Sequence, residues 1–283
     1  MLQVIAENKY QQQINLTANN NYVVLSVGGV TPPTATVNMA TLATSDGGIF
    51  NSSRLDTRNI VITIKPLNDI EINRIDLYKY FKAKQYIKLY FENYTRSVWI
   101  DGYIEVIDGD LYSDDERLQI SVICGDPYFK DTKTGLYAFS NVIDRFKFPF
   151  AIEASPGVPI SELSEYSEIA ITNNSDDETG VIIKMLAVGN VTNPTIYNMT
   201  TNENFSLTIS IEEGDIITID TRRNHKGVTL NHNGTISNII NYMTQNSEWL
   251  NLIVGDNIFS YECYSGAANL QVTVELQPIY EGI

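Results

Sequence analysis

The second half of the chain is a series of short apolar runs separated by turns rich in Gly, Asn and Asp. None of these runs shows the helical period of an amphipathic helix. Short strands at close spacing, each bounded by a turn signal, are typical of a β-sandwich. We therefore predict a β-sandwich here. The predicted strands are Glu168–Thr172, Val181–Leu186, Leu207–Ile211, Asp215–Asp220, Ile239–Met243, Trp249–Val254, Ile258–Tyr261 and Leu270–Leu276.

The first half is predicted to be mostly β with one amphipathic helix. Asn68 fits an N-cap and Glu71 lies three residues later, which is the spacing of a capping box. The helix is expected to end near Lys84. Four apolar side chains should then share one helical face and pack on a sheet. They are Ile70, Leu77, Tyr78 and Phe81.

Strands and turns surround this helix in the first half. Alternating residues predict strands at Thr34–Leu42 and Asn59–Ile64. The stretch from Ser45 to Ser53 between them is expected to be a polar, Gly-bearing loop with one exposed apolar pair, Ile49-Phe50. Two hairpins are predicted after the helix, with turns around residues 92–95 and 108–110.

The stretch Ile123–Phe129 closes the first half. An apolar strand leads into Gly125-Asp126-Pro127, and proline removes a ladder donor, so the strand should stop there. We predict that Tyr128 and Phe129 are buried and direct the chain onward. The predicted domains are a β-rich first domain at 1–135, a connector at 136–165 and a β-sandwich domain at 166–283.

Charge supports this division. The net charge is −15, of which residues 1–135 contribute 13 basic and 16 acidic side chains, or −3, and residues 136–283 contribute 6 and 18, or −12. This balance argues against sequence-specific nucleic-acid binding through a basic patch. No apolar run approaches the roughly 18 residues of a membrane helix, so we expect no membrane insertion. Met1–Ile5 is too short for a signal peptide, so we expect synthesis in the cytoplasm.

Few residues suggest a reactive or metal-binding site. Cys124 and Cys263 are expected to be buried free thiols, with a disulfide as the alternative. His225 and His232 are interpreted as surface loop residues that lie near one another, with metal binding as the alternative. An acidic cluster is interpreted as a solvated loop, with a weak calcium site as the alternative. The cluster consists of Asp108, Asp110, Asp114, Asp115 and Glu116.

Sequence signatures of enzymes are absent. The chain has no Gly-x-Ser-x-Gly elbow, no phosphate-binding Gly-Lys-Ser/Thr loop and no Gly-x-Gly-x-x-Gly. The alternative hypothesis of a glycosidase or esterase is supported only by the acidic composition. We therefore predict that the protein is not an enzyme, with no catalytic, cofactor-binding or metal-binding residues and no cofactor.

Several ordered motifs together resemble the distal tail proteins, the Dit-type baseplate hub family of phages and prophages of Gram-positive bacteria. The first half contributes the Asp46–Phe50 loop followed by Arg54, Arg58 and the strand Ile60–Ile64, and then the helix Ile70–Phe81. The junction Ile123–Phe129 is similar to the family's Cys/Asp-Pro-Tyr-Phe ending of the first domain. The C-terminal motifs are Ser247–Ile258 and Ile279–Ile283.

The resemblance implies an N-terminal ring domain and a C-terminal galectin-like β-sandwich. It implies a homo-hexameric ring in the virion, at the tail tip or baseplate, that joins the tail tube protein to tail-tip and receptor-binding proteins. Synthesis would then occur in the host bacterial cytoplasm. The alternative is a carbohydrate-binding module that contacts the host cell wall through aromatic side chains such as Trp249 and Tyr261.

Overall fold

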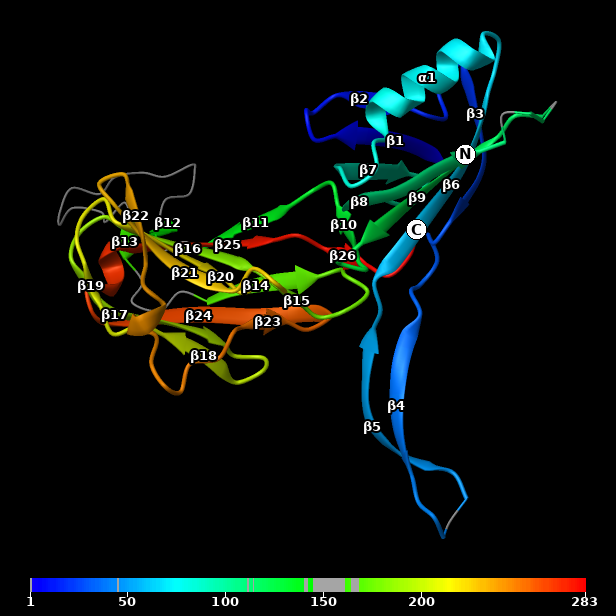
Figure 1. Cartoon of the computed structure of the whole chain (residues 1–283). Helices are drawn as coiled ribbons and strands as arrows, with labels where there is room; N and C mark the ends of the chain where they lie inside the picture. Colours follow the sequence, from blue (N-terminus) through cyan, green and yellow to red (C-terminus); the bar gives the residue numbers. More distant parts are fainter. Residues whose placement is uncertain are drawn as a thin grey trace, which may run out of the picture. The chain divides into compact units, whose positions relative to one another are not determined.

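The computed structural model describes residues 2–44, 46–110, 112–113, 115–139, 142–144, 161–163 and 168–283. The chain forms two compact units (Figure 1). Unit 1 comprises Met1–Thr132 together with Ile279–Ile283, and unit 2 comprises Lys133–Pro278. The chain therefore leaves unit 1, forms unit 2, and returns to unit 1 with its last five residues.

Unit 1 is built on one antiparallel sheet of nine strands. The strands are β1 (Gln3–Asn8), β2 (Gln13–Asn15), β3 (Tyr22–Gly28), β6 (Arg58–Pro66), β7 (Tyr86–Glu92), β8 (Ser97–Gly109), β9 (Leu118–Cys124), β10 (Phe129–Asp131) and β26 (Ile279–Tyr280). Their order is β2-β1-β7-β8-β9-β6-β3, and β10 pairs with both β8 and β26. Every second residue of β1, β6 and β7 is buried, so one face of the sheet supplies the core.

Helix α1 (Ile70–Tyr80) covers part of this core with Leu77, which is fully buried. The predicted capping box is wrong. Asn68 has a positive φ of 54°, and the N-cap is Asp69, which makes no side-chain capping bond. Instead, the side chain of Asn73 donates a hydrogen bond to the carbonyl of Leu67 at 2.7 Å.

The predicted buried face of the helix is half correct. Leu77 and Phe81 are buried, whereas Ile70 and Tyr78 are more than one third exposed. Tyr78 follows Leu77 directly, and neighbouring residues of a helix point in different directions. The helix also ends at Tyr80 rather than near Lys84, whose φ of 67° is not helical.

Unit 2 contains two facing antiparallel sheets. One contains β11 (Gly135–Ala138), β25 (Leu270–Leu276), β16 (Ile182–Ala187), β20 (Ile216–Asp220), β21 (Gly227–His232) and β22 (Thr235–Asn238), in that order. The other contains β14 (Glu168–Asn173), β24 (Gly255–Ser265), β17 (Val191–Asn198) and β18 (Glu203–Ser206), with β19 (Ser210–Ile211) on β17. Two-residue strands β15 (Thr179–Gly180) and β23 (Asn251–Leu252) pair with each other, as do β12 (Val142–Asp144) and β13 (Ser161–Leu163).

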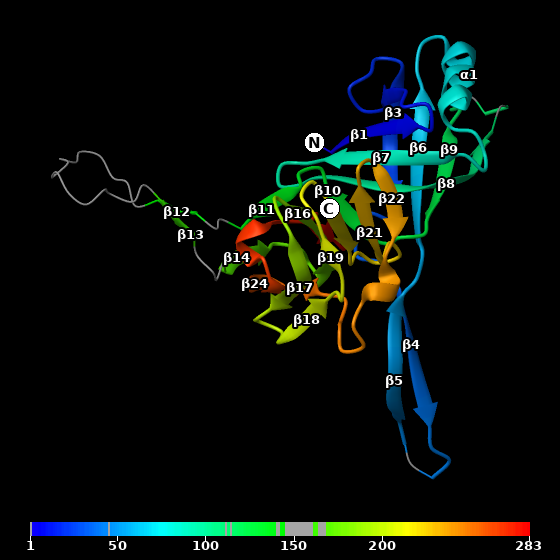
Figure 2. The same ribbon diagram turned by 90° about the vertical axis from the view of Figure 1, so that its left-hand side faces the viewer.

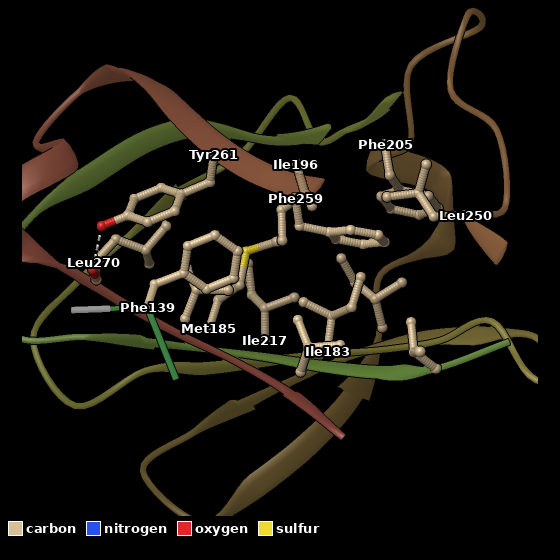
Figure 3. Close-up of a cluster of buried hydrophobic side chains, with 14 of the residues drawn as sticks. Phe139, Ile183, Met185, Ile196, Phe205, Ile217, Leu250, Phe259, Tyr261 and Leu270 are labelled. Carbon is tan, nitrogen blue, oxygen red and sulfur yellow. Dashed lines mark hydrogen bonds between the residues drawn. The ribbon is translucent and has the colours of Figure 1, made fainter. Parts of the chain in front are cut away.

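The core of unit 2 lies between these two sheets (Figure 3). Ile183, Met185 and Ile217 come from the first sheet, and Ile196 and Phe259 come from the second. The arrangement is a β-sandwich, because apolar side chains from two inner faces interdigitate. The predicted fold class is therefore confirmed: a mainly β chain with a β-rich first unit that carries one helix, and a β-sandwich after it.

Two predicted features of the sandwich need correction. Residues 239–243 are not a strand, because Ile240–Tyr242 form a short 3-10 helix, η1. The strand β17 was not predicted. It contains Asn193 and Pro194, two residue types that indicate a turn in a sequence. Asn193 has a positive φ of 49°. A second 3-10 helix, η2, spans Ala267–Asn269.

The compact units differ from the predicted domains at two places. Within the predicted connector 136–165, β11 pairs with β25 and Phe139 belongs to the core of unit 2. The residues Phe146–Phe150 and Pro156–Pro159, which suggested a connector, lie outside the described residues. At the C-terminal end, Ile279–Ile283 belong to unit 1. The boundaries 1–135, 136–165 and 166–283 stay predictions.

The guanidinium of Arg58 binds three separate segments of unit 1, namely the loop 29–31, the residues around Pro127 and the C-terminal residues around Glu281. Arg58 is 3% exposed and donates hydrogen bonds to four backbone carbonyls. The acceptors are the carbonyls of Gly29 at 2.5 Å, Thr31 at 2.7 Å, Pro127 at 2.6 Å and Glu281 at 2.6 Å. Its Cζ lies 4.6 Å from the ring centre of Phe129, a cation–π distance. Burial lowers the pKa of Arg58 from its ordinary value.

The returning residues Ile279–Ile283, here called the C-terminal strap, complete the sheet. Tyr280 pairs with Phe129, and its hydroxyl donates to Asp131 at 2.9 Å. Arg96 donates to the carbonyl of Gly282, and its guanidinium lies 4.2 Å from the ring of Tyr280. As predicted for the junction, Tyr128 and Phe129 are buried. The strap is thus an integral part of unit 1.

Both cysteines are free, and Cys124 is buried while Cys263 is partly buried. Their separation into unit 1 and unit 2 agrees with the prediction of free thiols. Burial raises the pKa of Cys124 to about 12 and that of Cys263 to about 11. The described part of the chain has no helix with the length and hydrophobicity needed to span a membrane.

Replacing Arg58 with Lys should destabilise unit 1 by about 3 kcal/mol, because an ammonium cannot reproduce the planar fork that reaches four carbonyls. The chain has two tryptophans, Trp99 and Trp249. In a Trp249→Phe background, the fluorescence of Trp99 reports urea unfolding of unit 1 alone. The control is Arg54→Lys, since the Arg54 side chain is 78% exposed. Equal urea midpoints for Arg58→Lys and Arg54→Lys would show that the hydrogen bonds of Arg58 do not stabilise unit 1.

The raised pKa values predict slow alkylation of both thiols in the folded protein. At pH 8 about one Cys124 in ten thousand and about one Cys263 in a thousand would be thiolate, the reactive form. Mass spectrometry after timed iodoacetamide treatment should show little modification of the native chain and full modification in urea. Native Cys124 reacting at the rate seen in urea would contradict the burial described here.

Candidate assembly surfaces

A long hairpin extends away from the sheet of unit 1 (Figures 1 and 2). It consists of β4 (Ala35–Thr41) and β5 (Gly48–Leu55), which pair with each other as a separate two-stranded sheet. We call residues 35–55 the arm. The predicted loop over 45–53 is wrong from residue 48 onward, since Gly48–Leu55 are a strand. The expected exposure of Ile49 and Phe50 is confirmed at 55% and 59%.

The arm exposes an unusual amount of apolar surface. Val37, Met39 and Leu42 are each at least half exposed, in addition to Ile49 and Phe50. The ladder places Met39 opposite Phe50 and Val37 opposite Ser53, with a register shift after Asn38. Val37, Met39 and Phe50 therefore share one face of the arm, while Ile49, opposite Ala40, lies on the other.

Within the described chain, no residue of the arm belongs to the core of unit 1. An isolated two-stranded hairpin with both faces in water is marginally stable at best. Soluble proteins rarely expose large apolar patches unless these bind something. The arm is therefore a candidate surface for contact with another protein chain.

The base of the arm is firmly attached. The Thr36 hydroxyl donates to the Asp56 carboxylate at 2.7 Å, and the Asp56 amide donates to the carbonyl of Thr34 at 3.1 Å. The loop 29–31 precedes the arm in the chain. The carbonyls of Gly29 and Thr31 in this loop accept hydrogen bonds from Arg58. Gly29 has a φ of 79°, and a Cβ there would lie 2.0 Å from the carbonyl oxygen of Asn59. Only glycine fits this position.

The outward side of α1 is a second apolar surface. Ile72 is 67% exposed, Ile75 is 48% exposed and Tyr78 is 36% exposed. Their spacing of three residues places them along one side of the helix, away from the buried Leu77. We call Ile72, Ile75 and Tyr78 the α1 face. A surface helix normally presents polar residues on this side.

The two histidines do not form a site. His225 lies in the connection before β21, and His232 is the last residue of that strand, so β21 separates them. The expectation that they lie near one another is wrong. His232 instead contacts the buried Asp215, with 2.6 Å between Nδ1 and Oδ1.

Two residues of the acidic loop, Asp115 and Glu116, form ion pairs with basic neighbours. Asp115 forms an ion pair with Lys65 at 2.5 Å and another with Arg117, and Glu116 pairs with Arg74. Hydrogen bonds from Lys65 and Arg117 lower the pKa of Asp115. Asp108 and Asp110 each accept a bond from a nearby backbone amide, and Asp114 lies outside the described residues. Among the described residues, no group of three or more His, Cys, Asp or Glu is arranged to hold a metal ion.

The aromatic residues proposed for sugar binding contribute to the sandwich core. Tyr261 is 4% exposed and its hydroxyl donates to the carbonyl of Leu270 at 3.1 Å (Figure 3). Trp249 is partly buried, packs against the core, and lies 5.4 Å from Phe205 between ring centres. The buried Tyr261 therefore has no exposed ring face on which a sugar could stack, and Trp249 is only partly exposed.

A model of a protein family matches part of the chain. Residues 174–280 match the model described as "Siphovirus-type tail component, C-terminal domain". No curated protein sequence matches the chain.

Solved structures resemble the whole chain. A crystal structure of SPP1 Dit (gp 19.1), described as a paradigm of the hub adsorption apparatus in phages that infect Gram-positive bacteria, has a TM-score of 0.68. The two proteins are 11% identical, and the alignment covers 99% of each chain. Two structures of the phage P2 baseplate in its activated conformation, with Ca and with Sr, have TM-scores of 0.51. The structure with Ca is 10% identical to this chain, and the alignment covers 97% of this chain and 98% of the baseplate chain. The structure with Sr is 9% identical, and the alignment covers 100% of both chains.

Identities this low show the fold alone, while the family model matches most of unit 2 by its sequence. The arm and the α1 face are parts of unit 1, outside the residues that this model matches. Together, the two comparisons support the resemblance inferred from the ordered motifs: residues 174–280 match the model of a siphovirus-type tail component C-terminal domain, and the chain as a whole has the fold of SPP1 Dit.

Proposed function

We propose that this protein is a structural hub of a phage or prophage tail, which forms a ring at the distal end of the tail tube. The observation that carries the proposal is the arm, a hairpin that is anchored at its base and exposes five large apolar side chains without packing on its own core. Such a surface supports contact with a neighbouring subunit.

The proposed assembly is a homo-hexamer. Repeated copies of one chain form a ring when each copy uses two different surfaces and the rotation closes. Unit 1 supplies such surfaces in the arm and the α1 face. The role is structural and requires no reaction, so we propose no catalytic residues.

The proposed partners are a tail tube protein on one side of the ring, and tail-tip and receptor-binding proteins on the other. The chain would be synthesised in the host bacterial cytoplasm and would act in the virion, at the tail tip or baseplate. The resemblance to SPP1 Dit, described as part of a hub adsorption apparatus, supports this location.

Removing the apolar character of the arm should prevent ring formation. We expect the wild-type chain to associate with rising concentration and to form rings visible by negative-stain microscopy. Changing Val37 to Thr, Met39 to Gln, Ile49 to Thr and Phe50 to Gln should leave a folded monomer, because the contact loses most of its buried apolar area. Analytical ultracentrifugation measures the mass of each form.

The matched control changes Tyr94 and Tyr112 to Ser. These two loop residues of unit 1 are also fully exposed, at 102% and 100%. Their replacement should leave association unchanged. A wild-type chain that stays monomeric at high concentration and never assembles with tail proteins would refute the proposed ring.

A further inference from the structure

The α1 face and the arm are two unpartnered apolar surfaces at opposite ends of unit 1. In both Figure 1 and Figure 2 the helix lies at one end of the unit and the arm projects at the other. The arm of a chain therefore does not cover its own helix. Two different surfaces that face away from each other are the arrangement needed for head-to-tail contact between copies.

We propose that the α1 face of one copy is the docking site for the arm of the next copy. This inference rests on the proposed ring and names the two surfaces that close it. Val37, Met39 and Phe50 on one side of the arm would pack against Ile72, Ile75 and Tyr78 of the neighbouring helix. The occupant of the α1 face is thus a second copy of this chain.

Charge favours this pairing. The arm carries one acidic and one basic residue, Asp46 and Arg54, and α1 carries two of each, so both elements have a net charge of zero. The whole chain has a net charge of −15, of which −12 lies in residues 136–283. Contact between the arm and α1 therefore brings no net like charge together, whereas contact between two second halves would.

The available area also fits an interface between copies. Three large apolar side chains on this face, Val37, Met39 and Phe50, are each about half exposed and offer roughly 240 Å² if a free side chain presents on the order of 150 Å². This is about a third of the area that each partner buries in a standard interface, about 800 Å². Each copy would contribute its arm to one neighbour and its helix to the other, which doubles the surface buried per copy in the ring.

Two full-length variants test the pairing. The arm variant carries Met39→Glu and Phe50→Glu, and the helix variant carries Ile72→Glu and Ile75→Glu. Both pairs of substitutions are at exposed positions, and far-UV circular dichroism and tryptophan fluorescence verify that each variant is folded. The matched control is Ile236→Glu in unit 2, where the isoleucine is 70% exposed.

Each variant alone should be monomeric, with self-association weakened by about 100-fold or more, as expected when central apolar contacts are lost. The control should assemble like the wild-type chain. The decisive sample is an equimolar mixture of the two variants. The arm variant still has an intact helix, and the helix variant still has an intact arm, so one intact contact remains. We expect a 1:1 dimer that grows no further.

Other outcomes overturn the inference. A helix variant that forms wild-type rings would show that the arm docks elsewhere. A mixture that stays monomeric would show that the arm and the helix do not bind each other, as would occur if another tail protein covers the helix. In both cases a wild-type ring would leave the proposed function intact. A wild-type chain that never assembles would overturn the proposed function together with this inference.

Discussion

The buried guanidinium of Arg58 holds unit 1 together. A buried charge is usually compensated by a carboxylate, but among the described residues the partners of Arg58 are four carbonyl oxygens and the face of Phe129. Four of its five N–H groups are used, and the dipoles of four peptide groups replace its hydration. Because the four carbonyls belong to three different segments, one side chain fixes the loop before the arm, the junction at Pro127 and the C-terminal strap.

This arrangement explains how unit 1 can carry a projecting hairpin. The arm contributes nothing to the core, so its position depends on its base. The base consists of the loop 29–31, held by Arg58, and the bonds around Asp56. A rigid base reduces the conformational freedom that the arm would lose on binding, and less lost freedom means tighter association. The strength of the proposed contact between copies would therefore depend on a bond network that the contact itself does not include.

Sequence patterns were informative where local chemistry decides structure. Alternation in Asn59–Ile64 and the spacing of the short runs in the second half indicated the sheet and the sandwich, and the burial of Tyr128 and Phe129 followed from the stop at Gly125-Asp126-Pro127. The patterns were misleading where tertiary contacts override them. Gly48–Leu55 is polar and Gly-bearing, yet pairing with β4 makes it a strand. The strand β17 includes Pro194, which local signals exclude.

The assembly surfaces were predictable only in part. The exposure of Ile49-Phe50 was visible in the sequence because an apolar pair stood within a polar stretch. The α1 face was not, because apolar residues on both sides of a helix suggest burial, and only the structure shows that Ile72 and Ile75 point to solvent. Arg58 was noted as part of a family motif, but its partners are distant in sequence. The bond to Glu281 spans 223 residues, a separation that no local pattern encodes.

That separation has a consequence for the order in which the protein folds. The sheet of unit 1 is complete only when β26 pairs with β10, and β26 is made after the whole of unit 2. Unit 2, which is continuous in sequence, can therefore fold during synthesis while unit 1 still lacks its last strand. Closing so long a loop is slow, and it becomes easier once a folded unit 2 replaces a flexible chain of the same length. The surfaces proposed to connect copies thus become fully supported only after residues 279–283 have been made, which would delay assembly until that point of synthesis.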